Sequence, residues 1–479
     1  MVRLAPRSKV NGWARAIAHQ AKEFGPTPLR VLAGRLPSGL RGSLYRNGPA
    51  FLQRAGQQVA HWFDGDGGIL AIHFGGQQAQ ALYRYVKTQG WQAEEAAGRY
   101  FFASYGMVPP GNWLQRFRAQ LKNAANTSVL ALPDRLLALW EGGLPHTLSL
   151  DTLDTLGLDT LGKLEPMATY SAHPKCDPQT GDIFNFGVRF GRRATLHLYR
   201  CDRMGILQQR SQISLSNLAP LHDFVLAGRY LIFCIPPVRL NALAVLARLA
   251  SYCDALEWQP HQGTEILVVD RHSLQVVSRF HTDPWYQWHF SNGYELPDGS
   301  VTLALARYQD FQTNEFLREV PQGEIHTIAP SPLWQLRLDP QRGKLLENTE
   351  VLTRSCEFPV VHPTEVGQPF RYSYLSLRRQ TPDAERELFG AIARFDHHTG
   401  QLDEADWGDS GYPSEPIYAP DAEQPNQGWV LTVVYDSATH TSELWIFAAD
   451  HLAGEPVCRL ALPEVIPPGF HGTWQAAQR

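Results

Sequence analysis

The sequence predicts an all-β protein, a seven-bladed β-propeller with helical and loop insertions that cap one face. Three observations lead to this prediction. A strand–turn–strand pattern recurs along the chain, the 39 glycines and 34 prolines supply many turns, and a His or Glu recurs at one place in most of the repeats. Together they indicate blades that surround a central site.

The recurring pattern is an apolar strand, an Asp, a few turn residues that often include Gly, and a second strand. Asp and Gly suit such turns because they tolerate the backbone angles, and Asp can also bond within its own turn. Six segments have this pattern, at residues 148–157, 196–207, 266–277, 333–346, 391–402 and 444–457. A seventh hairpin fits residues 69–83 and turns at Gly75–Gly76. This spacing predicts seven four-stranded blades within one domain over residues 1–479.

Two segments interrupt the strand pattern. Residues 109–126 and 239–257 have apolar side chains three or four positions apart, which predicts helices. We expect both helices as insertions on one face of the propeller. The second segment is apolar over most of its helical circumference, so it either lies in the core or faces lipid, and it is too short to span a bilayer.

Composition excludes several classes of protein. The net charge of -4 gives no basic footprint, so we expect no nucleic-acid partner. The six cysteines are far apart and form no CxxC pair, which indicates reduced thiols in a cytoplasmic protein. The basic residues near the N-terminus are not followed by an apolar segment, so a signal peptide is not expected. No apolar run reaches the ~18 residues of a membrane span.

One metal-binding or acidic residue follows most turn aspartates by a similar number of residues. Because equal phase means an equal place in each blade, and because inner strands converge on the axis, these side chains should meet at one point. The six residues are His173, His222, His289, Glu357, Glu415 and His471. Glu141 is the candidate of the first blade, whose phase the insertion at 109–126 disturbs.

These residue types indicate a catalytic metal centre. A structural zinc site normally uses Cys or ligands that are close in sequence, whereas these ligands are far apart. Four neutral imidazoles leave a divalent iron its full charge and leave positions for oxygen and substrate. A ligating His usually donates its other N–H to a carboxylate, a role that fits Glu141, Glu357 and Glu415. We therefore predict Fe²⁺ bound by His173, His222, His289 and His471.

Around these residues the sequence resembles the carotenoid cleavage oxygenases, nearest to the cyanobacterial apocarotenoid oxygenases. The matching stretches run in family order: GSLYRNGP (42–49), HWFDGDGG (61–68), LKNAANT (121–127), RLLALWEGG (135–143), SAHP (171–174), LHDF (221–224), WHFSNGYE (288–295), CEFPVVHP (356–363), SEPIYAP (414–420) and HGTW (471–474). In one departure, Phe290 stands where the family often has a second His.

The resemblance implies a seven-bladed propeller with a non-haem Fe(II) on the same four His, three of them backed by the same Glu. It implies a reaction in which O2 cleaves a conjugated double bond into aldehydes or ketones. The nearest resemblance points to the central 15,15′ bond of an apocarotenoid, with retinal as a product. It also places Thr127 beside an open iron position.

Substrate access and two alternatives complete the expectations. The candidates for an apolar substrate tunnel are Phe63, Trp140, Trp288 and Phe358, each of which could equally be ordinary core. Residues 239–257 and 113–117 are expected to make peripheral membrane contact. The alternatives are an oxygenase that cleaves the double bond of a hydroxylated stilbene, and a non-catalytic propeller scaffold, which gives no reason for four His in phase.

Overall fold

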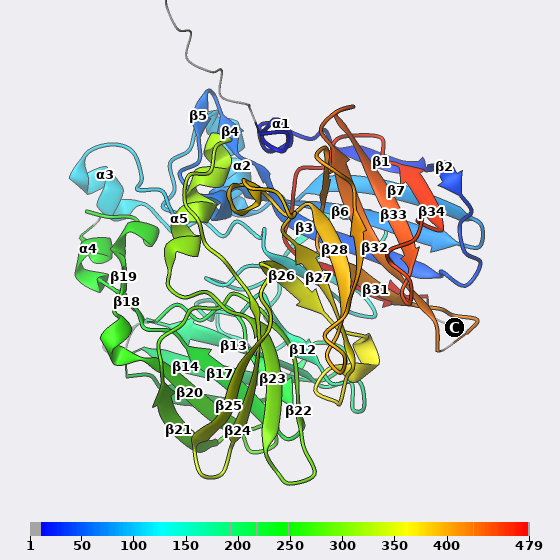
Figure 1. The fold of residues 1–479 in the computed structure, drawn as a ribbon. Helices are drawn as coiled ribbons and strands as arrows, with labels where there is room; N and C mark the ends of the chain where they lie inside the picture. Colours follow the sequence, from blue (N-terminus) through cyan, green and yellow to red (C-terminus); the bar gives the residue numbers. More distant parts are fainter. Residues whose placement is uncertain (1–10, 191–193, 217–218, 248, 425, 478–479) are drawn as a thin grey trace, which may run out of the picture.

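The computed structural model describes residues 11–190, 194–216, 219–247, 249–424 and 426–477. These residues form an all-β propeller, which confirms the predicted fold class. Sheets make up most of the molecule, and short helices gather at one side of it (Figure 1). No helix within the described ranges is long and apolar enough to cross a membrane.

Three sheets come from the N-terminal part of the chain, and the first of them also takes in a C-terminal strand. Its order is β1 (Phe24–Pro28), β7 (Gln78–Tyr85), β6 (Asp66–Gly75), β3 (Gly42–Phe51) and β35 (Gly472–Ala476). The second has the order β11 (Thr155–Leu158), β10 (His146–Leu148), β9 (Leu136–Leu139) and β8 (Ser128–Ala131). The third has the order β12 (Lys175–Cys176), β13 (Ile183–Arg189), β14 (Thr195–Cys201) and β15 (Leu207–Ser214).

The remaining large sheets follow in chain order. An eight-stranded sheet runs β21 (Val276–Thr282), β20 (Thr264–Asp270), β17 (Tyr230–Ile235), β16 (Val225–Ala227), β22 (Phe290–Glu295), β23 (Val301–Ala306), β24 (Leu333–Asp339) and β25 (Lys344–Leu352). A four-stranded sheet runs β26 (Cys356–Val360), β27 (Tyr372–Leu377), β28 (Ala391–Asp396) and β29 (Leu402–Asp406). A six-stranded sheet runs β2 (Arg30–Gly34), β34 (Cys458–Ala461), β33 (Thr441–Ala448), β32 (Gly428–Asp436) and β30 (Gly411–Pro413), with β31 (Ile417–Pro420) also on β32.

The smaller elements lie between these sheets. Two hairpin-like pairs are β4 (Gln53–Arg54) with β5 (Gln57–Gln58), and β18 (Val238–Leu240) with β19 (Leu256–Trp258). The α-helices are α1 (Ala14–Ile17), α2 (Gln89–Ala97), α3 (Trp113–Arg118), α4 (Ala242–Leu246) and α5 (Gln312–Glu319). The 3-10 helices are η1 (Trp62–Asp64), η2 (Cys253–Ala255), η3 (Pro260–Gln262), η4 (Val320–Gln322), η5 (Pro363–Glu365) and η6 (Ala384–Arg386).

All seven hairpins that the sequence predicts are present. They are β6–β7, β10–β11, β14–β15, β20–β21, β24–β25, β28–β29 and β33–β34. The turn aspartates act as expected: the Asp270 Oδ1 atom accepts hydrogen bonds from the backbone N–H groups of His272 and Ser273. The period of the sequence therefore corresponds to real antiparallel hairpins.

The two predicted helical insertions are wrong in length. Of residues 109–126 only α3 is an α-helix, because Asn112 caps its start and Ala119 turns to extended backbone at its end. Of residues 239–257 only α4 is an α-helix, and the segment returns to form the β18–β19 pair. Residue 248 lies outside the described residues. Their apolar spacing is not a core pattern either, because neither helix has a buried residue.

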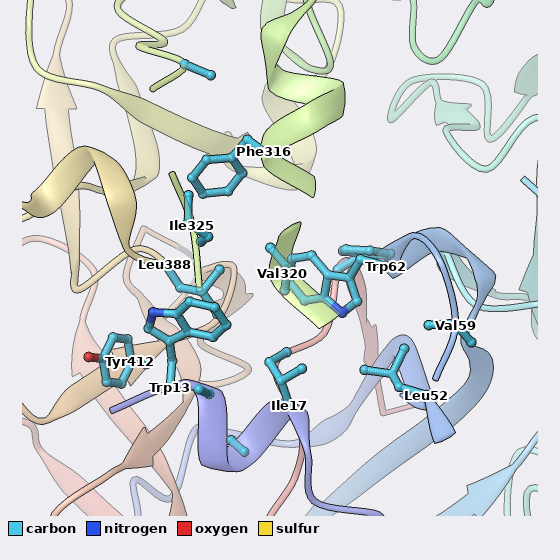
Figure 2. Packing of buried hydrophobic residues seen from close by; sticks show 14 of the residues in the cluster. Trp13, Ile17, Leu52, Val59, Trp62, Phe316, Val320, Ile325, Leu388 and Tyr412 are labelled. Atoms are coloured by element: carbon cyan, nitrogen blue, oxygen red, sulfur yellow. The ribbon is translucent and has the colours of Figure 1, made fainter. Parts of the chain in front are cut away.

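The ring of sheets closes between the two ends of the chain. Strand β35 pairs with β3 from Gly42↔Ala476 to Arg46↔Gly472, and β2 pairs with β34 on the neighbouring sheet. On the capped face, Ile17 of α1 and its N-cap residue Trp13 pack into an apolar cluster that includes Val320 (Figure 2). Closure by strands from both ends ties the first and last sheets together.

Among the buried polar groups, His146 gives a prediction about acid stability. Its side chain is 5% exposed, and burial lowers its pKa to about 4. The unfolded chain therefore takes up a proton near pH 6.5 that the folded chain refuses, so stability is full above that pH and falls as the pH drops towards 4. Between pH 7 and pH 5 this group should lower the free energy of unfolding of the wild type by about 2 kcal/mol. In His146→Leu that part of the decrease should be absent. Urea unfolding at both pH values tests this, and an unchanged pH dependence in the variant would contradict it.

Candidate metal centre

The His and Glu residues that follow the turn aspartates at similar distances share one structural position, the start of an inner strand. His173, His222 and His289 immediately precede β12, β16 and β22 or lie within three residues of them. Glu357 is the second residue of β26, Glu415 lies just before β31, and His471 precedes β35. The shared position explains why side chains so distant in sequence point to a common centre.

The structure brings the four histidines together in a buried cluster. Each is 8% exposed, and one ring nitrogen from each lies within 4.8 Å of those of the other three. The Nε2 atom of His222 is 2.9 Å from that of His173 and 3.2 Å from that of His289. The ring of His471 completes the cluster, with its centroid 4.6 Å from that of His289. Within the described residues this is the group of His, Cys, Asp and Glu side chains arranged to hold a metal ion.

Three carboxylates face the outer nitrogens of three of these rings. Glu357 Oε2 lies 2.6 Å from Nδ1 of His289, and Glu415 Oε1 lies 2.9 Å from Nδ1 of His471. Glu141 contacts Nδ1 of His222 from the loop between β9 and β10. Each pair fixes the proton on Nδ1 and turns Nε2 toward the centre.

Further groups hold the two buried carboxylates in place. The Tyr308 hydroxyl donates to Glu357 Oε1 over 2.8 Å. The backbone N–H of Gly472 donates to Glu415 Oε2 over 2.7 Å, and the buried Arg46 guanidinium lies 3.7 Å from that same oxygen. Sequence reasoning missed Arg46 and Tyr308. Arg46 lies within GSLYRNGP, one of the stretches that resemble the family, so the sequence could have indicated it. No sequence feature indicated Tyr308.

The electrostatics of the cluster favour the neutral imidazole at two of the four histidines. Burial, together with the neighbouring histidines, puts the pKa values of His173 and His289 well below the ordinary value. Burial also disfavours protonation of His222, but the Glu141 carboxylate outweighs it and leaves that pKa raised. Burial raises the pKa of Glu357 to about 7. A cation at the centre would favour the ionised carboxylate.

The ring nitrogens fit a divalent metal. With Nδ1 protonated, the Nε2 atoms of His222 and His289 present two lone pairs only 3.2 Å apart, and neither can donate to the other. A metal between them removes this repulsion. A spacing of about 3 Å would allow both nitrogens to lie about 2.0–2.1 Å from one ion, the usual distance between a metal and an imidazole nitrogen.

Thr127 occupies the place in the second sheet that the histidines occupy in theirs. It directly precedes β8, its backbone carbonyl accepts from the N–H of His471, and its side chain lines the cavity beside the cluster. Its hydroxyl donates to Asn126 Oδ1 over 3.1 Å. Glu141 does not share this phase, because it reaches the cluster from a loop further out in the same sheet.

A cavity of about 120 Å³ opens beside the cluster and has mainly apolar walls. Of the four tunnel candidates, Phe63, Trp288 and Phe358 line it. Trp140 is not among the described residues that line this cavity, and its ring lies over Gly142 instead, where an added Cβ would be 2.4 Å from the indole. From the apolar cluster in Figure 2, Trp62, Phe316, Leu388 and Tyr412 also line the cavity.

Local backbone features aim two of these aromatic rings. A capping box between His61 and Asp64 forms η1 and presents Phe63 toward Trp288, with ring centroids 5.4 Å apart. Phe358 has a left-handed φ of 52° where the β26–β27 register shifts, and its ring stacks on His289. Such strain commonly accompanies functional positions.

Comparisons with known proteins agree with this geometry. Residues 17–476 match the family described as retinal pigment epithelial membrane protein. The chain is 32% identical to apocarotenoid-15,15'-oxygenase of Synechocystis sp. over 96% of each chain, and 26% identical to resveratrol cleavage oxygenase 1 of Aspergillus fumigatus over 92% and 91%. It is similar to a solved structure of cobalt-substituted Synechocystis ACO, with a TM-score of 0.88, 31% identity and coverage of 97% and 98%. The chain therefore belongs to the retinal pigment epithelial membrane protein family, the carotenoid oxygenases.

Proposed function

We propose that this protein is a non-haem Fe²⁺ dioxygenase that cleaves the central 15,15′ double bond of an apocarotenoid to give aldehydes such as retinal. The observation that carries the proposal is the convergence of four buried imidazoles, three of which (His222, His289 and His471) line an apolar cavity. The similarity to a Synechocystis enzyme named for the 15,15′ position supports the substrate and bond. The cobalt-substituted relative supports a divalent metal.

Each residue of the centre has a role in this proposal. His173, His222, His289 and His471 hold the metal, while Glu141, Glu357 and Glu415 fix the tautomers of three of them. A bound Fe²⁺ supplies the chemistry by which O2 adds across a conjugated double bond, one oxygen atom ending in each carbonyl product. Thr127, which lines the cavity beside the cluster, would limit access to a bound metal from that side. Phe63, Trp288 and Phe358 exclude water and hold the polyene against it.

We further propose that the propeller has seven blades in a single domain. The eight-stranded sheet counts as two blades, because β16 and β22 share one parallel pair, Ala227↔Gly293, while its other strand pairs are antiparallel. Its halves also pack face to face, with β17 and β20 side chains against β23 and β24 in one apolar cluster. Seven inner-strand starts then surround the axis: Thr127, His173, His222, His289, Glu357, Glu415 and His471.

Peripheral membrane contact belongs to the same proposal. Leu243, Leu246 and Leu249 are 68–81% exposed around α4, and Trp113 and Phe117 are 77% and 64% exposed on α3. Both helices project from the same side of the molecule in Figure 1. Aromatic contacts from Phe63 through Tyr105 to Tyr252 connect the cavity wall with the α4 segment. A polyene could therefore pass from lipid to the cavity without crossing water. Six unpaired cysteines support a cytoplasmic location.

One experiment separates this proposal from its alternatives. Iron-loaded protein is incubated with a panel of apocarotenals and hydroxylated stilbenes in air, and product masses are measured. The proposal requires retinal from a matching apocarotenal. Cleavage of stilbenes alone would favour the second activity, which the similarity to the resveratrol enzyme supports. A protein that takes up no iron when iron is supplied and converts neither class would be a scaffold.

Glu357→Gln tests the role of the buried carboxylates. The variant keeps an acceptor for His289 but loses the charge, so iron affinity or activity should fall by about 10–100-fold. Iron binding and the pH profile of kcat/KM are measured together, with the exposed Glu347→Gln as the control. If the wild type has a bell-shaped profile and the variant loses one limb of it, Glu357 acts as an acid or base and the proposed role fails.

A further inference from the structure

Arg378, at the end of β27, is a buried arginine with unusual surroundings. Its side chain is 5% exposed, and its Nε and Nη1 atoms have no hydrogen-bond partner within the described residues. Its guanidinium lies between two aromatic rings, 4.7 Å from the centroid of Phe316 and 4.4 Å from that of Phe389. Aromatic faces attract a cation but leave its N–H donors unsatisfied.

The other buried arginines show what a protein normally supplies to this group. Each has a carboxylate oxygen within 3.7 Å, as Arg379 has in Glu387 at 2.9 Å; the others are Arg46, Arg54 and Arg271. Arg378 has no such ion pair in the described part of the chain. The Glu385 carboxylate acts on the charge of Arg378, but no described residue accepts a hydrogen bond from Nε or Nη1. Two buried donors without an acceptor are costly, so they call for a partner from outside the chain.

The cavity beside the metal centre is where that partner would come from. Arg378 lines it together with Phe316, Leu388 and Phe389. Two phenylalanine rings separate the guanidinium from the cluster, since Phe389 contacts Phe358 and Phe358 stacks on His289. Ser376, two residues before Arg378 on the chain, faces the same cavity, and its buried hydroxyl also has no partner in the described residues.

We propose that Arg378 and Ser376 form a polar subsite for the oxygenated end of the substrate, a terminal carboxylate or carbonyl group. The inference rests on the proposed function, because it takes this cavity as the substrate site. A planar guanidinium matches a carboxylate with two parallel N–H bonds and a carbonyl with one. Holding that end fixes which double bond of the polyene lies over the metal.

The test compares three polyenes of equal chain length that end in a carboxylate, an aldehyde or a plain hydrocarbon. For the wild type we expect kcat/KM to decrease in that order. Arg378→Met keeps the length of the side chain but removes its charge and donors. It should lower kcat/KM about 10- to 100-fold for the acid, less for the aldehyde, and hardly at all for the hydrocarbon. Arg378→Lys should recover part of the loss with the acid only.

Arg379→Met is the matched control, because its partners are all protein groups, among them Glu387 and the carbonyl of Gly408. It should lower stability without changing the preference among the three polyenes. If Arg378→Met lowers kcat/KM equally for all three, Arg378 only supports the fold, for example through nearby Glu385, and the subsite is refuted.

A binding measurement keeps this inference separate from the proposed reaction. Under nitrogen, quenching of tryptophan fluorescence by the acid and the hydrocarbon reports their binding, since Trp62 and Trp288 line the cavity. Wild type that binds the acid more tightly than Arg378→Met does, yet cleaves no polyene in air, would support the subsite and refute the proposed reaction. Equal binding by both proteins would refute the subsite alone.

Discussion

Replacing His222 with Ala is expected to remove most of the bound iron and nearly all of the activity. The ring lies between His173 and His289, with Nε2 to Nε2 distances of 2.9 and 3.2 Å, so its loss opens the centre of the cluster. It also leaves Glu141 without its imidazole partner. The loss should exceed the roughly 100-fold that removal of an outer hydrogen-bond partner costs.

The same result is expected at His173, His289 and His471, because each supplies one nitrogen to the same group. Iron per chain, measured by mass spectrometry of the metal, and turnover of an apocarotenal are followed together. The control is His281→Ala, a histidine on β21 whose side chain is 57% exposed. Full iron content in two of the four cluster variants would overturn the assignment.

The second large effect concerns the exposed leucines of α4. Leu243→Glu combined with Leu246→Glu should abolish binding to liposomes and slow the turnover of membrane-held substrate. Each leucine contributes about 1.5–3 kcal/mol when it enters lipid, so losing both weakens attachment by a factor of at least 100. Turnover of detergent-dispersed substrate should change much less.

Neither leucine packs in the core, since both are more than two-thirds exposed, so the double variant should fold. A matched control is Val276→Glu with Leu346→Glu, two apolar residues each 43% exposed, on β21 and β25. In Figure 1 these strands lie in the lower part of the molecule, below α4. Liposome binding that survives in the α4 variant, or falls equally in the control, would refute this attachment surface.

The turns and the phase of the repeats could be predicted from sequence because they are local. An Asp such as Asp270 bonds to its own turn wherever the turn lies, so each hairpin is marked in the sequence. The His and Glu residues at the starts of the inner strands could be predicted because each lies at a similar distance along the chain from its turn Asp. Glu141 does not have this regular spacing because it lies in the loop between β9 and β10 and not at the start of an inner strand. Only tertiary packing places it beside His222.

The helical insertions could not be predicted from spacing alone. The periodicity of residues 239–257 is compatible with a long helix. The pairing of Val238–Leu240 with Leu256–Trp258 limits the α-helix to Ala242–Leu246. Arg378 shows the same limitation. Nothing in its sequence neighbourhood distinguishes it from Arg379, because the difference lies in the partners that the fold provides.

The closing strand has a consequence for the order in which the protein matures. His471 stands immediately before β35, so the strand that completes the first sheet also delivers the last of the four histidines to be synthesised. A nascent chain that already contains His173, His222 and His289 cannot yet offer the complete site. Binding of a metal by all four histidines therefore requires the β3–β35 pairing, and a metal held by all four would stabilise that pairing.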